Sequence, residues 1–323
     1  VKLPASLTGI GRHAFYHCEK LEGIELPENL KTIGKAAFAF TNLKAITIPG
    51  SVEYIDHLAF YRCDNLKEAI LEEGVQEIGD VAFLECTSLE NVSIPGTVTG
   101  VFAGSFYNTP WLNSMKDDFV IAGDGILLRY HGSSQEVVIP DNVKMIGAQS
   151  FGTMGENVIE YEKSKTLDYE EDSSYTKIRK VVLHEGITSI GNGAFSGCTG
   201  LEEINLPDTI TEIRNSSFAD CISLQKIDIP AGVVKIGASA FYRCKSLERV
   251  ILPENLSIIG FSAFEKCRQL DNIIIPEKVT EIRGNAFAGC SNLHTVEIPE
   301  TVKDIASDAF SGTPWYENST DEF

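Results

Sequence analysis

The sequence has few basic residues for its length and no long apolar segment. Its 323 residues include 27 Lys and Arg against 46 Asp and Glu, a formal charge of −19. Nucleic acids and anionic membranes attract basic surfaces, so this charge argues against both as partners. No run reaches the ~18 apolar residues of a membrane-spanning helix. From Val1 on, there is no basic segment followed by an apolar one, so we see no signal peptide. We expect neither nucleic-acid binding nor membrane insertion.

Motifs of catalysis, cofactor binding and metal binding are also missing. The chain has no GxSxG, no Walker-type glycine loop and no GxGxxG opening a helix. Its six His are scattered, and His13 and His17, which share helical spacing, lack the Glu of an HExxH site. Because the chain has 46 acidic residues, neighbouring carboxylates such as Glu72 and Glu73 are expected and do not by themselves indicate catalysis. We therefore expect a protein that is not an enzyme and holds no cofactor or metal.

The sequence does contain a strong internal repeat. A Phe preceded by Ala or Ser recurs twelve times, usually at intervals of 22 or 23 residues, with two intervals of 45 and 44. The repeat Phe residues are Phe15, Phe38, Phe60, Phe83, Phe106, Phe151, Phe195, Phe218, Phe241, Phe264, Phe287 and Phe310. A fixed period of this length is typical of a solenoid, in which each unit is one coil.

Other positions keep the same frame, so that one unit reads LxxIxIPxxVxxIGxxAFxxC. The two Ile of LxxIxIP are two residues apart, which predicts a strand with both side chains on one face. The Pro ends the strand because it has no N–H to donate. We interpret Ile-Gly as a turn with Gly at positive φ, and Ala-Phe to Cys as a short helical or irregular return. Stacked coils would bury a common core and form a parallel sheet on one face.

The repeat resembles a known family. A 23-residue period opened by LxxIxL is similar to leucine-rich repeats, and the continuation IPxxVxxIGxxAFxxC resembles the BspA-like leucine-rich repeats of bacterial surface proteins. Pro, as at Pro27, stands where the usual pattern has Asn or Cys. The resemblance implies a repeat solenoid of about 12 coils at the cell surface, without catalytic activity. It also implies a role in adhesion or host interaction.

The two long intervals predict two insertions in one solenoid. Phe119–Ala122 and Ile126–Tyr130 flank Gly-Asp-Gly, which predicts a β-hairpin. The second insertion is rich in charge, Ser and Tyr, and we interpret it as an exposed acidic loop that is either functional or tolerated. The predicted division is a first array at 1–111, a hairpin insert at 112–136, a connecting repeat at 137–154, the loop at 155–177, a second array at 178–316 and a tail at 317–323.

A Thr-Pro-Trp motif occurs twice, at 109–111 and 313–315. Phe119 and Phe323 each fall eight residues after the Trp. From this parallel, and from the start of the chain inside a unit, we hypothesise a fragment of a longer repeat protein.

All eight Cys occupy one repeat position, three residues after the Phe. They are Cys18, Cys63, Cys86, Cys198, Cys221, Cys244, Cys267 and Cys290. Disulfides and a metal ladder are alternatives, but in-register side chains in adjacent coils keep their Cβ atoms ~4.8 Å apart, beyond the usual disulfide range. No CxxC pair supports zinc. We expect free, buried thiols that act as small apolar groups.

Candidate contact residues lie on the outward face of the predicted strands and in the acidic loop. Ile251 and Ile274 are neighbours in adjacent coils, and Ile70 stands alone; each is either part of a contact patch or harmlessly exposed. In the loop the candidates are Tyr161, Tyr169 and Tyr175. Four Tyr that directly follow a repeat Phe serve either an interface or packing at the coil edge. These are Tyr16, Tyr61, Tyr107 and Tyr242.

The sequence thus leads to a functional hypothesis. We expect a monomeric, extracellular, non-catalytic binding module that presents a curved surface to a protein or glycan, including proteins of a host's extracellular matrix. This step rests on the family resemblance, because a fold does not fix a function. The alternatives are a structural spacer and a repeat region accessory to a hydrolase or another larger surface protein.

Overall fold

The computed structural model describes residues 1–151 and 176–318. Its internal contacts divide the chain into two units, 1–131 and 132–323, and each is treated separately below. Both units are stacks of coils with the predicted 23-residue period, which confirms the repeat solenoid.

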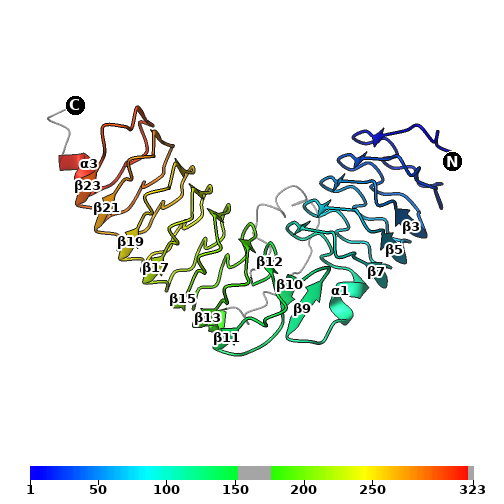
Figure 1. The fold of residues 1–323 in the computed structure, drawn as a ribbon, viewed down its shortest axis with the longest axis horizontal. Coiled ribbons are helices and arrows are strands. Elements are labelled where there is room, and N and C mark those ends of the chain that lie inside the picture. The colour runs from blue at the N-terminus through cyan, green and yellow to red at the C-terminus, as the bar shows by residue number, and fades with distance from the viewer. Residues whose placement is uncertain (152–175, 319–323) are drawn as a thin grey trace. The chain divides into compact units, whose positions relative to one another are not determined.

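The strand predicted from LxxIxIP is present in most coils and is called here the main strand. Within each unit, successive main strands lie side by side (Figure 1), and most neighbouring main strands pair in parallel. In the first unit they are β3 (Ala45–Ile48), β5 (Glu68–Leu71) and β7 (Asn91–Ser93). In the second unit they are β11 (Glu136–Val138), β13 (Lys180–Val182), β15 (Glu203–Ile204), β17 (Lys226–Asp228), β19 (Arg249–Ile251), β21 (Asn272–Ile274) and β23 (Thr295–Glu297).

A second parallel ladder, which we did not predict, runs through the Ile five residues before each Phe. Each coil contributes a two-residue short strand whose second residue points inward. In the first unit these are β1 (Gly9–Ile10), β2 (Thr32–Ile33), β4 (Tyr54–Ile55), β6 (Glu77–Ile78) and β8 (Gly100–Val101). In the second unit they are β12 (Met145–Ile146), β14 (Ser189–Ile190), β16 (Glu212–Ile213), β18 (Lys235–Ile236), β20 (Ile258–Ile259), β22 (Glu281–Ile282) and β24 (Asp304–Ile305).

The return around each repeat Phe consists of turns, and it forms a third set of inter-coil hydrogen bonds. In the second coil the N–H groups of Ala36, Phe38 and Phe40 donate to carbonyls of the following coil at 3.0, 2.8 and 2.9 Å. Residues two before and two after the Phe have positive φ, as in Ala36 (51°) and Phe40 (60°). This backbone is uncommon outside glycine. Residues with positive φ alternate with ordinary ones along the return, and its inter-coil N–H groups therefore point toward the following coil.

The Gly after the repeat Ile has a different purpose from the predicted one. Among the described residues, no Gly at this position has positive φ. A Cβ at Gly34 would lie 2.8 Å from the backbone nitrogen of Arg12, and one at Gly260 would lie 2.5 Å from that of Ala238. The predicted positive φ was therefore wrong. At Gly34 and Gly260, Gly is needed because the backbone of the preceding coil passes too close for a side chain.

The core of each unit is a stack of the repeat Phe rings. Successive ring centroids in the first unit are 4.8 to 5.2 Å apart, with planes within 8° of parallel. In the second unit the spacing is 5.0 to 5.5 Å. Burying one such side chain stabilises the fold by about 1.5–3 kcal/mol, and offset stacking adds about 0.5–1.5 kcal/mol per pair. The stack therefore contributes to the cohesion between coils along each array.

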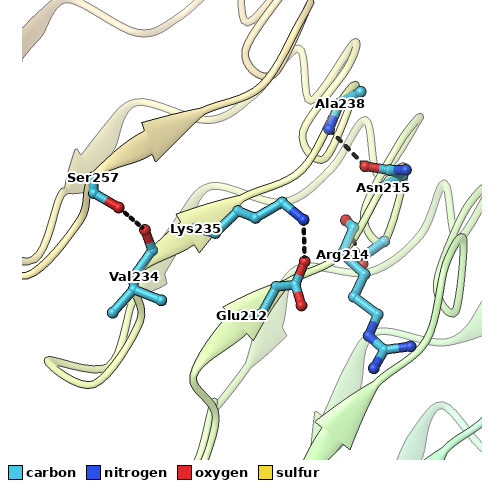
Figure 2. Close-up of polar contacts among 8 residues, drawn as sticks. Glu212, Arg214, Asn215, Val234, Lys235, Ala238 and Ser257 are labelled. Atoms are coloured by element: carbon cyan, nitrogen blue, oxygen red, sulfur yellow. Dashed lines mark hydrogen bonds and ion pairs between the residues drawn. The ribbon is translucent and has the colours of Figure 1, made fainter. Parts of the chain in front are cut away.

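Polar side chains also tie neighbouring coils together along the short-strand face. Figure 2 shows three such contacts in the second unit. Lys235 pairs with Glu212 at 2.7 Å, and the side-chain oxygen of Asn215 accepts a hydrogen bond from the backbone of Ala238 at 2.8 Å. The Ser257 hydroxyl donates to the carbonyl of Val234 at 3.0 Å. Each contact joins adjacent coils, so these groups support the scaffold.

The predicted hairpin is also confirmed. β9 (Phe119–Ala122) and β10 (Ile126–Tyr130) pair in antiparallel fashion in the first unit, with the same bounds as the prediction. Two five-residue helices complete the described structure, α1 (Pro110–Ser114) and α3 (Pro314–Asn318).

Candidate partner-binding surfaces

The outward face of the main strands carries the predicted isoleucines. In the second unit Ile251 is 56% exposed and Ile274 is 59% exposed. They come from neighbouring strands β19 and β21, while Asp228 pairs in register with Ile251 and Glu297 with Ile274. The two isoleucines, called here the isoleucine patch, are thus an apolar pair flanked by acids.

The same outward position contains an apolar residue that the sequence analysis missed. Val138 on β11 is 61% exposed and pairs in register with Val182. Counting from the preceding repeat Phe fails here, because the hairpin lies between Phe106 and this strand. The Pro140 that ends the strand was the available signal. Val138 has the exposure of the patch residues, but its partner Val182 is only partly exposed.

The remaining predicted contact residues give a mixed picture. Tyr161, Tyr169 and Tyr175 lie outside the described residues, as does nearly all of the 155–177 loop. Of the four Tyr that follow a repeat Phe, Tyr16 is 43% exposed and Tyr61 is buried. The Tyr61 ring meets the Phe40 ring edge-on at 5.2 Å. For Tyr61, packing at the coil edge is therefore the correct interpretation.

The Tyr242 ring on the return face of the second unit is also engaged by its neighbours. The guanidinium of Arg243 lies 5.9 Å and the ammonium of Lys266 5.2 Å from the ring centroid. Lys266 also donates to the Tyr242 hydroxyl at 3.3 Å. These contacts favour edge packing for Tyr242 as well.

The Cys position is buried and structural. Seven of the eight Cys are buried, Cys18 is exposed, and all eight are free. Each buried thiol donates to the carbonyl of the repeat Phe in the preceding coil, as Cys221 does to Phe195 at 3.2 Å. Burial raises the pKa of the Cys221 thiol well above its ordinary value. A thiol that stays protonated is a poor nucleophile.

The first Thr-Pro-Trp motif forms a cap on the first array. Thr109 occupies the Cys position, donates its hydroxyl hydrogen to the carbonyl of Phe106 at 2.7 Å and accepts from the N–H of Leu112 at 3.3 Å. It is the N-cap of α1, and Pro110 suits the first helical position. The Trp111 ring meets the Phe106 ring edge-on at 4.9 Å, and the backbone N–H of Trp111 donates to the carbonyl of Leu89 at 2.7 Å. The indole therefore covers the end of the Phe stack.

The second motif repeats this geometry at the end of the second array. Thr313 donates to Phe310 at 2.7 Å and accepts from the N–H of Tyr316 at 3.2 Å. The Trp315 ring meets the Phe310 ring edge-on at 4.9 Å, and the backbone N–H of Trp315 donates to the carbonyl of Leu293 at 3.0 Å. We call each of these structures a tryptophan cap.

A shallow cavity of about 320 Å³ lies beside the first tryptophan cap. Trp111 forms one side of it, and the outward face of β5 and β7 forms the floor. The lining residues are Glu68, Ala69, Ile70, Asn91, Val92, Ser93 and Trp111. Ile70, which in the sequence stood alone, is thus placed next to an indole. The sequence analysis missed this link, although Ile70 and Ile274 are separated by the same 204 residues as the two Trp.

Other kinds of site do not emerge from the described residues. Within 1–151 and 176–318 no three His, Cys, Asp or Glu side chains are gathered as a metal ion would require. In the same part of the chain, no helix is both long and apolar enough to cross a membrane.

The repeat pattern and the coil geometry together agree with one family. The family described as the BspA type leucine-rich repeat region matches residues 1–113, 128–213, 170–292 and 211–320. The chain belongs to this family. None of the curated proteins compared with the chain matches it.

Solved structures of other leucine-rich repeat proteins resemble this BspA-type chain. A leucine-rich repeat protein of T. pallidum is 29% identical, with a TM-score of 0.52 over 63% of this chain and 91% of that one. One from Bacteroides ovatus is 23% identical, with a TM-score of 0.38 over 100% of this chain and 74% of that one. A leucine-rich cell surface protein of Faecalibacterium prausnitzii is 25% identical, with a TM-score of 0.41 over 97% and 81%. The first of these supports the fold.

Proposed function

We propose that this BspA-type chain is an extracellular, non-catalytic adhesion module that binds a partner through the outward face of its main strands. The observation that carries the proposal is the isoleucine patch. Ile251 and Ile274 are each more than half exposed on the neighbouring main strands β19 and β21, at an outward position where most residues are polar. Adjacent exposed apolar side chains mark interaction sites more often than scattered ones do.

The surroundings of the patch favour a protein as its partner, with a glycan as the other class. Arg249 and Asn272 lie on the same strands as the two isoleucines, and Asp228 and Glu297 lie beside them in register. An apolar centre with a charged and polar rim is the usual composition of a protein interface. The acid excess of the chain makes a basic partner surface the better match.

The extracellular location is supported by the family, and the free thiols are compatible with it. The F. prausnitzii relative is described as a cell surface protein. Oxidising surroundings favour disulfides, yet this chain keeps free thiols. For the seven buried thiols, burial resolves the conflict, because a buried protonated thiol is protected from oxidation.

The test compares charge substitutions at two places on the same face. In the double variant Ile251→Asp/Ile274→Asp we expect binding to immobilised, purified extracellular matrix proteins to fall at least tenfold. The matched control is Val138→Asp, which makes the same kind of change at an outward position of equal exposure in the same unit.

Circular dichroism checks that all three proteins remain folded, which we expect because exposed substitutions seldom change stability by more than about 0.5 kcal/mol. Equal binding by the double variant and the unmodified chain would refute the patch as the binding site. Absence of binding to every matrix protein and glycan tested would favour the spacer function instead.

A further inference from the structure

The cavity beside the first tryptophan cap combines aromatic, apolar and hydrogen-bonding groups. Its side is the indole of Trp111, and Ile70, which is 37% exposed, provides an apolar floor. The exposed Glu68, Asn91 and Ser93 surround this floor with a carboxylate, an amide and a hydroxyl. The site thus offers one flat aromatic surface and three hydrogen-bonding side chains within one lining.

The indole is held in place by the scaffold. Its edge-on contact with Phe106 and the hydrogen bond from its backbone N–H to Leu89 are both made with the core. Thr109 fixes the start of the helix that carries it. A preorganised ring loses little conformational entropy when a ligand stacks on it, which favours binding.

This arrangement matches the chemistry of a sugar ring. A pyranose has an apolar face of C–H groups and an edge of hydroxyls. The electron-rich face of an indole attracts such C–H groups, and carboxylate, amide and hydroxyl side chains bond to sugar hydroxyls. Ligand pockets span about 300–1,000 Å³, so a shallow cavity of about 320 Å³ has room for one or two sugar rings of a longer glycan.

Charge narrows the class of sugar further. The Glu68 carboxylate lines the cavity, and the chain as a whole has a net charge of −19. Both oppose a sugar acid or a sulfated sugar. We infer that this cavity binds a neutral sugar residue of a glycan, stacked on Trp111 and hydrogen-bonded to Glu68 and Asn91. The site belongs to the first unit and does not depend on the isoleucine patch of the second.

The experiment uses the indole itself as the reporter. The chain has only two Trp, so the variant Trp315→Phe leaves Trp111 as its sole indole. We expect a saturable change in Trp111 fluorescence with at least one neutral hexasaccharide from a panel built of glucose, galactose, mannose or N-acetylglucosamine. Oligogalacturonate and sialyllactose, which are acidic, should cause no change. Fluorescence that stays constant with every neutral sugar, or that responds better to the acidic ones, overturns the inference.

Substitutions in the same Trp315→Phe background then locate the site. Glu68→Ala or Asn91→Ala should weaken sugar binding about tenfold each, since each removes hydrogen bonds worth about 1–1.5 kcal/mol. The matched controls are Asn272→Ala and Thr295→Ala, which lie at the equivalent positions 204 residues later, and they should leave the affinity unchanged.

If Ile70→Thr abolishes the fluorescence response while Glu68→Ala and Asn91→Ala leave it intact, the cavity takes an apolar group and the inference is wrong. Failure here leaves the isoleucine patch standing, because that patch is tested by Ile251 and Ile274 on a different unit.

Discussion

The two tryptophan caps end their arrays in the same way, but the sheets beside them differ. At each cap a Thr bonds to the last repeat Phe and a Trp ring covers that Phe at 4.9 Å. The outward residues next to the first cap are Glu68, Ile70, Asn91 and Ser93, whereas those next to the second are Asn272, Ile274, Thr295 and Glu297.

Both ends have an isoleucine at the equivalent outward position, but the surroundings of the two side chains differ. Ile70 is 37% exposed and Ile274 is 59% exposed. The inward positions of the coil determine the scaffold, and the outward positions vary without disturbing it. A difference in binding between the two ends therefore has to come from a few outward side chains.

The largest predicted difference between the two units is their stability in alkali. In the second unit, burial raises the pKa of four thiols, those of Cys198, Cys221, Cys244 and Cys267. In the first unit, burial raises the pKa of the Cys86 thiol. A thiol in the unfolded chain has a pKa of about 8.5. Each thiol with a raised pKa therefore contributes its full stabilisation below about pH 8.5. Above that pH, the free energy of unfolding falls by about 1.4 kcal/mol per thiol for each pH unit.

Urea unfolding of Trp111→Phe and Trp315→Phe variants measures this, because each retains one indole in one unit. Between about pH 7.5 and about pH 9.5, the midpoint reported by Trp315 should fall further than that reported by Trp111. Thr occupies the same repeat position at Thr41, so replacing Cys221 by Thr is a conservative test. The variant should lose less stability at alkaline pH. Equal losses in the two units would contradict the prediction.

Removing the last Phe of each stack should produce the next largest effect. Phe106 and Phe310 are each 3% exposed, and replacing a buried Phe by Ala costs about 3–5 kcal/mol. Because the caps have the same geometry, Phe106→Ala and Phe310→Ala should cost nearly the same in their own units. Urea unfolding with the single-Trp variants gives both values. Costs that differ by more than about 2 kcal/mol would show that the two caps are not equivalent.

The smallest predicted effect separates the cap from the coil. Replacing Thr109 or Thr313 by Cys restores the common residue of this position but removes the N-cap hydroxyl. Loss of an N-cap costs about 1 kcal/mol, so both variants should be less stable by that amount in urea unfolding. As a control, Thr41→Cys lies at the same position in a coil without a helix, and it should be near neutral. A cost at Thr41 as large as at Thr109 would mean that the cap hydroxyl is not the cause.

Several features of the fold were predictable because they repeat. The Phe and Cys positions and the hairpin strands at 119–122 and 126–130 follow from spacing and turn residues. The second ladder was not predicted, because a two-residue strand such as Thr32–Ile33 is too short to show alternation. The purpose of Gly34 was misjudged, because it depends on the backbone of the preceding coil, which a single repeat unit does not reveal.

The left-handed residues and the cavity were missed for related reasons. His13, Ala36, Leu58 and Arg62 all adopt positive φ, yet none is Gly or Asn, the residues that usually indicate this conformation. For the cavity, the outward isoleucines could be named from the repeat frame, but the contact between Ile70 and Trp111 depends on how the cap meets the sheet. Ile251 and Ile274 are exposed, and their role in binding stays a prediction.

The one-way hydrogen bonds of the return have a consequence for assembly. In each return the inter-coil N–H groups point to the following coil and the matching carbonyls to the preceding one, as with Phe38 and Ala59. The return ladder therefore has a direction, with a donor end and an acceptor end. Two like ends offer no complementary groups to each other, so only a head-to-tail arrangement could extend the return ladder. Such heterologous contacts build chains rather than closed twofold pairs. Both tryptophan caps sit at donor ends.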